Sequence, residues 1–208
     1  MAAIEHVEHA EHGHGHADPK ARLENLKFAT WLYLASEVII FTVLIATYII
    51  YSLNHREVVK EVHEEAGVLL VAINTFILLA SSWAMVMGLR ALKLGNRQGL
   101  INWIGLTALL GTVFVALQYV EYRTLSDAGI VVFYTGTEFS EFGMRFYAPT
   151  AFHGAHVIVG VLWALFIIWN TRRGAYSATN YAGVEIFGLY WHFVDVVWIF
   201  LFTFIYLI

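Results

Sequence analysis

Five long apolar stretches constrain what this sequence can fold into. Each has the length of about 20 residues or more that a helix needs to cross the hydrocarbon core of a bilayer. Because lipid offers the backbone no hydrogen-bond partner, a spanning segment must be a helix or part of a closed barrel, and unbroken apolar runs lack the alternation of barrel strands. The sequence therefore predicts an all-α integral membrane bundle of five transmembrane helices. The expected spans are residues 27–52, 66–92, 99–122, 147–170 and 183–208.

The composition agrees with a membrane protein and excludes several other classes. Of the 208 residues, 59% are hydrophobic and 13% are charged, whereas a soluble domain has about 25% charged residues. The absence of Cys excludes disulfides, thiolate metal sites, iron–sulfur clusters and a copper centre held by Cys. The net charge of −4 has the wrong sign for a nucleic-acid binder. We therefore expect no nucleic-acid partner.

Residues 1–26 form a polar, acidic segment that differs from the rest of the chain. It has too little apolar surface to offset its ordering entropy, so we predict a mobile tail ahead of a transmembrane domain at residues 27–208. It does not resemble a cleaved signal peptide, so the first apolar stretch is expected to remain as a span. Its histidines either chelate a divalent metal without fixed geometry or are simply solvated. These histidines are His6, His9, His12, His14 and His16.

The distribution of Lys and Arg predicts the orientation. Connections are expected at residues 53–65, around 93–97, at 123–146 and around 172–174, the second being a tight turn and the fourth a turn. The N-terminal segment and these two turns, together with Lys27 and Arg90 at the adjoining span ends, share one side of the membrane and hold eight of the 12 Lys and Arg residues. Positive residues concentrate on the cytoplasmic side. The N-terminus is therefore predicted to be cytoplasmic and the C-terminus external.

Ionisable side chains inside the spans are the candidate functional residues, because a charge in hydrocarbon is costly and must face protein or water. At about 1.5 Å per residue, Glu37 lies roughly 15 Å from the inner end of its helix. His192 and Asp195 lie at a similar depth, so these three are expected to form an inner layer. The same arithmetic predicts a second layer near the outer face. The outer layer comprises Glu121, His153 and His156.

The spacing within these layers has two interpretations. His192 and Asp195 are three residues apart and share a helix face, so they can hydrogen-bond, and His153 and His156 have the same relation. An acid and an imidazole at one depth can relay protons near neutral pH. Alternatively, each side chain hydrogen-bonds a neighbouring helix and fixes its rotation in the bundle. Both interpretations are compatible with the sequence.

The small number of histidines inside the predicted spans argues against a redox centre. Three of the ten histidines lie inside the predicted spans, whereas a centre with two haems and a copper needs about six. A single metal held by His153, His156 and Glu121 is geometrically possible. We expect the chain to carry no catalytic residue and no haem or copper of its own.

Five motifs resemble subunit III of the haem–copper respiratory oxidases. They occur in the order of that family, and the last is the longest and most specific. They are Trp31–Phe41 (WLYLASEVIIF), Asn74–Ser82 (NTFILLASS), Leu117–Tyr122 (LQYVEY), Phe152–Gly160 (FHGAHVIVG) and Glu185–Trp198 (EIFGLYWHFVDVVW).

The resemblance implies a subunit without haem or copper in an aerobic, proton-pumping oxidase that reduces oxygen to water. Such a subunit packs against the catalytic subunit I, in a complex that also contains subunit II, binds phospholipid, and supports proton uptake and durability during turnover. Haem and copper would lie on the partner subunits. The family's acids and imidazoles align with both layers described above. Longer members carry two further N-terminal helices that line a lipid cleft, and the five-span form is similar to that of bacterial plasma-membrane enzymes.

The sequence leaves two alternatives to an oxidase subunit open. The family also resembles accessory subunits of nitric oxide reductases. An independent proton or ion transporter is a different class, and the lack of an internal repeat argues against it.

Overall fold

The computed structural model describes residues 19–57, 59–60, 67–127, 129–130 and 138–207. Within them, five helices are long and apolar enough to cross a membrane, which confirms the predicted all-α, five-helix class. The helices are α1 (Pro19–Asn54), α3 (Val68–Lys93), α4 (Arg97–Asp127), α5 (Glu138–Arg172) and α6 (Ala182–Leu201), and α6 continues into the π-helix η1 (Phe202–Leu207).

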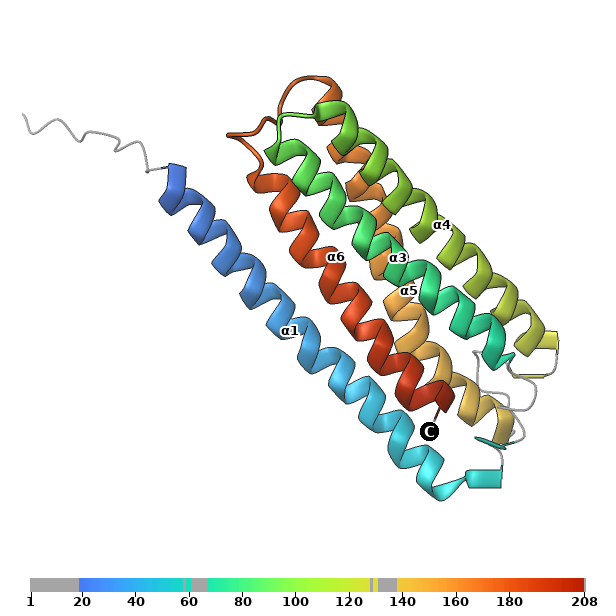
Figure 1. The fold of residues 1–208 in the computed structure, drawn as a ribbon. Coiled ribbons are helices and arrows are strands. Elements are labelled where there is room, and N and C mark those ends of the chain that lie inside the picture. Colours follow the sequence, from blue (N-terminus) through green and yellow to red (C-terminus); the bar gives the residue numbers. More distant parts are fainter. Residues whose placement is uncertain (1–18, 58, 61–66, 128, 131–137, 208) are drawn as a thin grey trace, which may run out of the picture.

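Four of the helices form a closed ring, and the fifth packs on its outside. Helix α3 packs against α4, α4 against α5, α5 against α6, and α6 against α3. Helix α1 packs on α5, α6 and η1. Figure 1 shows α6 between α1 and α3 on one side of the molecule. One surface is therefore made by α1, α6 and α3 together.

The turn between α3 and α4 is as tight as the sequence predicts. Gly95 has φ of +80°, a conformation that side chains disfavour, and its N–H bonds the Leu92 carbonyl at 2.9 Å. The Asn96 side-chain oxygen then accepts a hydrogen bond of 2.7 Å from the Gly99 N–H and caps the first turn of α4. The short connection makes these two helices antiparallel neighbours.

Three helix ends extend beyond the expected spans. Helix α1 begins at Pro19, α4 ends at Asp127, and α5 begins at Glu138, so part of the expected loop 123–146 is helical. The extensions carry charged residues, which hides them from a search for apolar runs. Their apolar residues Leu125, Phe142 and Phe146 are nevertheless buried. Tertiary packing therefore sets the end of α4 and the start of α5.

The core is organised around two tryptophans of α6. The Trp191 ring fills a slot opposite Gly160 and Gly111, where an added Cβ would lie 2.5 Å and 2.8 Å from ring atoms. Its indole N–H donates to the Ser81 hydroxyl at 3.0 Å. Trp198 makes the equivalent bond to the Thr75 hydroxyl at 2.9 Å. Close packing thus joins α6 to α4 and α5, and two interhelical hydrogen bonds join it to α3.

Candidate functional site

The buried pair Glu37 and His156 joins α1 to α5. A carboxylate oxygen of Glu37 lies 3.4 Å from His156 Nε2, and the two residues are 8% and 9% exposed. His156 Nδ1 lies 2.8 Å from the Phe152 carbonyl, which can only accept, so Nδ1 carries a hydrogen. The same carboxylate oxygen of Glu37 has no hydrogen-bond partner among the described residues, so its contact with Nε2 is one of proximity and charge. The pair is a buried contact between a carboxylate of α1 and an imidazole of α5.

A second cluster lies between α3 and α6. The Ser82 hydroxyl is 2.5 Å from His192 Nδ1. Asp195 is 3% exposed and lies close to Ser82. Neither of its carboxylate oxygens has a hydrogen-bond partner in the described part of the chain. The hydrogen bond that the sequence allows between His192 and Asp195 is therefore not formed, and His192 pairs with Ser82 instead.

His153 is enclosed by aromatic rings. It is fully buried, with ring centroids 4.9 Å from Trp198 and 5.7 Å from Phe114. Neither ring nitrogen has a hydrogen-bond partner among the residues that the structure describes. His153 and His156 share a helix but face different surroundings, one the aromatic core and the other Glu37.

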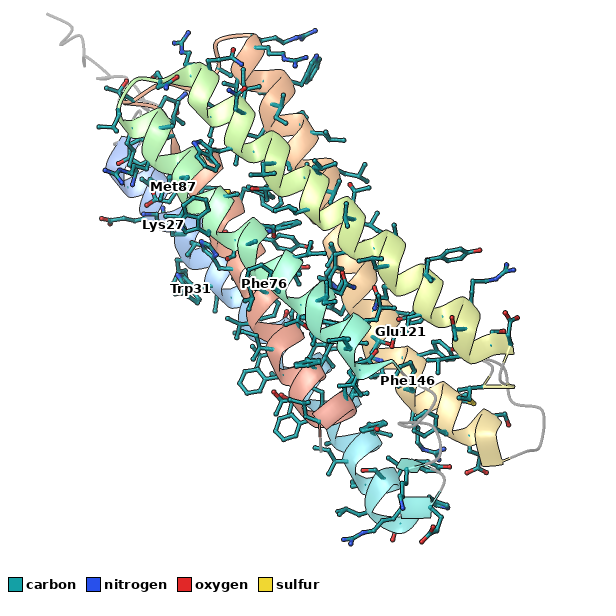
Figure 2. The ribbon with its side chains drawn as sticks, turned by 45° about the vertical axis from the view of Figure 1, so that its right-hand side comes forward. Lys27, Trp31, Phe76, Met87, Glu121 and Phe146 are labelled. Atoms are coloured by element: carbon teal, nitrogen blue, oxygen red, sulfur yellow. The ribbon has the colours of Figure 1, made fainter. Side chains whose placement is uncertain are left out.

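Glu121 lies towards the opposite end of the bundle from Lys27, near Phe146 (Figure 2). It is 6% exposed, and the Tyr206 side chain of η1 lies beside it. Nearby, the Tyr147 hydroxyl donates to the Ile130 carbonyl at 3.1 Å. Glu121 thus lies where α4 meets the C-terminal π-helix.

The pairing in the structure cuts across the two expected layers. Glu37 of the inner layer meets His156 of the outer layer, whereas His192 and Asp195 neighbour Ser82. The fourth predicted span begins at residue 147, whereas α5 begins at Glu138, so His156 lies near the middle of the helix and not near its outer end. The functional roles assigned to both layers stay predictions.

The structure also bears on the metal sites considered for this chain. In the described residues, no group of three or more His, Cys, Asp or Glu side chains is arranged to hold a metal ion. Glu121, His153 and His156 are accordingly not gathered into one site. The five histidines His6, His9, His12, His14 and His16 lie outside the described residues.

Sequence reasoning missed several polar partners that the structure reveals. Three hydroxyl groups of α3 pair with side chains of α6: those of Ser81 and Thr75 accept hydrogen bonds from tryptophan N–H groups, and that of Ser82 pairs with His192. On α4, the Gln118 side-chain amide donates to the Thr150 carbonyl at 3.1 Å. All are neutral, so a search for ionisable residues passes over them. Their signal is a small polar side chain inside an apolar span, where an unpaired polar group is costly.

Comparison with known proteins gives the family. The sequence matches the family "Cytochrome c oxidase subunit III" over residues 6–208. The chain belongs to this family. The resemblance to haem–copper oxidase subunit III is thus confirmed, and the matched region contains the whole helical bundle.

Relatives of this subunit III chain carry names from two classes of oxidase. Cytochrome c oxidase subunit 3 of Synechocystis is 39% identical over 198 residues, which cover 95% of this chain and 79% of that protein. Quinol oxidase subunit 3 of Bacillus subtilis is 33% identical over 207 residues, which cover 97% of each chain. Cytochrome bo(3) ubiquinol oxidase subunit 3 of Pseudomonas putida is 32% identical over 180 residues, covering 86% and 83%.

Proposed function

We propose that this chain is the accessory subunit of an oxygen-reducing haem–copper oxidase in the bacterial plasma membrane. In this proposal it packs against the catalytic subunit I, in a complex with subunit II, and the haem and copper lie on those partners. The observation that carries the proposal is the match to subunit III over residues 6–208. The contacts of His156 with Glu37 and of His192 with Ser82 link helices to one another, which supports a companion role.

Within the complex, we propose that the subunit supports proton uptake and keeps the enzyme active during turnover. Glu37 and His156 supply a buried place where one proton can be held. Asp195 and His192 lie beside Ser82 in a second cluster. Both clusters lie within the spans, where unpaired polar groups destabilise the structure. Substitutions in either cluster are expected to weaken the assembly of the complex before they affect the chemistry on subunit I.

The purified oxidase tests this role with Glu37→Ala and Asp195→Ala. We expect each variant to lose activity during turnover faster than the unaltered enzyme, or to retain less of this subunit, while the initial rate changes little. The measurement is oxygen consumption followed over many turnovers, with subunit content determined on the same sample. An initial rate near zero in a fully assembled enzyme would contradict the proposal. Ion flux in liposomes containing this chain alone would instead favour a transporter.

We also propose a phospholipid on the groove between α1 and α5. The groove has a volume of about 480 Å³, and Arg145 and Glu141 mark its polar end. The Arg145 guanidinium lies 4.5 Å above the Tyr51 ring and is partly exposed, so it is held in place yet accessible to a phosphate. The remaining lining is mostly apolar and suits an acyl chain. It consists of Leu44, Thr47, Met144, Ala148 and Pro149.

Native mass spectrometry of the complex tests the lipid site. Arg145→Ala is expected to reduce the lipid retained by the complex, whereas Arg123→Ala, a change at an exposed arginine of α4, is expected to leave it unchanged. Equal lipid retention in both variants would contradict this site.

The orientation is proposed from the charge distribution. The N-terminus and the α5–α6 connection are placed in the cytoplasm, and the C-terminus outside. Because the chain has no Cys, single cysteines can report the side of the membrane. In intact cells, an impermeant thiol reagent should label Ser126→Cys and not Thr179→Cys, both at exposed positions. Labelling of Thr179→Cys alone would reverse the orientation.

A further inference from the structure

The surface shared by α3, α6 and α1 differs from an ordinary lipid-facing surface because it carries an ionisable side chain, that of His192. On α3 it includes Leu79 and Val86, which lie on the same helix face as Ser82. On α6 it includes His192, Val196 and Ile199, which follow one another at helical spacing. The four apolar residues are 41% to 50% exposed. We call these five residues, with the adjoining groove between α6 and α1, the open face.

His192 is the polar exception on the open face. The other imidazole and carboxylate side chains near the middle of the described spans are closed off from the surroundings: Glu37, His153, His156 and Asp195 are all at most 9% exposed. His192 is only half-buried, although it lies near the middle of the segment formed by α6 and η1. An ionisable group thus reaches the surface of the bundle at the depth of the hydrocarbon core.

The hydrogen bonds of His192 are incomplete within this chain. Its Nδ1 pairs with the Ser82 hydroxyl at 2.5 Å. No described residue forms a hydrogen bond with its Nε2, and this atom is not enclosed by the bundle. Acyl chains cannot supply a hydrogen bond, and imidazoles at this depth are normally turned towards protein or water. The surface around His192 therefore leaves Nε2 available to a polar partner from outside the chain.

Next to His192, the groove between α6 and α1 gives room for such a partner. It has a volume of about 440 Å³, and its lining includes Val196, which lies one turn from His192 on the same face of α6. On the α1 side, the small residues Thr42 and Ala46 line it, which allows another backbone to approach. A row of side chains from a helix fits such a groove between two helices.

We propose that the open face docks a transmembrane helix of another oxidase subunit, and that this helix presents a hydrogen-bonding side chain to His192 Nε2. The inference rests on the proposed function, since it assumes that the chain works inside an oxidase. It goes further by assigning the docking face and the chemistry of the partner. The apolar groove supplies packing, and His192 sets the register of the docked helix, as buried polar groups do elsewhere in membranes.

Photocrosslinking in the intact oxidase tests the docking face. A photoreactive group is attached to a single cysteine in the naturally Cys-free chain, either at Val196→Cys on the open face or at Val159→Cys on α5. The two valines are matched at 50% and 54% exposure, and Val159 does not line the groove. We expect Val196→Cys to crosslink to another oxidase subunit and Val159→Cys to crosslink to lipid. Lipid adducts alone at Val196→Cys, or subunit adducts at Val159→Cys only, would overturn the proposal.

The role of His192 is tested by retention of this subunit after detergent extraction of the complex. His192→Leu is expected to weaken retention about three- to fivefold, the effect of losing one interhelical hydrogen bond in a membrane. His192→Gln keeps a donor and an acceptor and is expected to restore most of it. Ser82→Ala is the matched control, because it removes the internal bond and leaves the Nε2 partner in place. Release as strong in Ser82→Ala as in His192→Leu would overturn the proposal.

The outcomes separate this inference from the function on which it rests. If no oxidase subunit co-purifies with the unaltered chain, the proposed function fails. If the oxidase co-purifies but Val196→Cys crosslinks only to lipid, the docking face is wrong and the function stands.

Discussion

Helices α1 and α6 are held in the same bundle by different means. In the most apolar stretch of α1, 22% of the residues are buried, compared with 50% in α6. The buried residues of α1 follow one narrow stripe that includes Leu34, Glu37, Phe41 and Tyr48. Helix α6 is surrounded by α5, α3 and α1. Helix α6 is therefore held by packing against three helices, whereas α1 is attached along a single stripe, and substitutions should affect the two helices differently.

The largest effect is expected where Trp191 packs against Gly160. The Gly160→Val change places a branched side chain 2.5 Å from ring atoms of Trp191, and overpacking of this kind costs about 3 kcal/mol. We expect a marked fall in the thermal stability of the purified complex, with α6 affected first. Gly105→Ala is the control, because nothing lies within 4 Å of the added methyl group. Equal stability of both variants would show that the slot is not tightly packed.

The next effect is expected at the buried link of α1. Glu37→Ala leaves His156 Nε2 without its partner, which costs about 1–3 kcal/mol, whereas Glu37→Gln keeps a hydrogen-bonding side chain. Hydrogen exchange should accelerate along α1 in the Ala variant and not along α6. Acceleration of similar size in α6 would contradict the idea that α1 is attached separately.

A smaller effect is expected for Tyr48→Phe. The Tyr48 hydroxyl donates to the Ile205 carbonyl at 3.2 Å and ties α1 to η1, and one such bond contributes about 0.6–1 kcal/mol in a membrane. Faster exchange at the C-terminal half of α1 would report its loss. Thr47→Val removes a hydroxyl that bonds only within α1, so it should leave this exchange unchanged. Equal exchange rates in the Tyr48→Phe and Thr47→Val variants would contradict a stabilising role for the Tyr48 hydrogen bond.

The smallest effect is expected at the surface ion pair of α1. Lys27 Nζ lies 3.0 Å from Glu185 on α6, and Lys93 of α3 lies 3.8 Å from the same carboxylate. Lys27→Met should lower stability by about 0.5 kcal/mol at most, because exposed ion pairs are weak. Thermal unfolding at low and high salt should show the difference shrinking as salt rises. A loss larger than that of Glu37→Ala would reverse the order proposed here.

The sequence was sufficient for the fold class, because hydropathy and length alone define five spans. It was insufficient for helix ends such as Glu138, where charged residues interrupt buried ones like Phe142. The partner of Glu37 could not be deduced either, since pairing depends on helix rotation as well as depth. Only the structure shows that Trp191 fills the space opposite Gly160.

The central claim is that this chain is an accessory subunit of an oxidase whose haem and copper lie on other subunits. The most direct test is to determine which subunits retain the haem after this chain is removed. An affinity tag on the chain is used to purify the complex from membranes, and the chain is then dissociated in detergent. The account predicts that a haem-containing oxidase co-purifies and that haem and copper stay with the other subunits after dissociation. A Soret absorbance band or stoichiometric copper on the separated chain would contradict it.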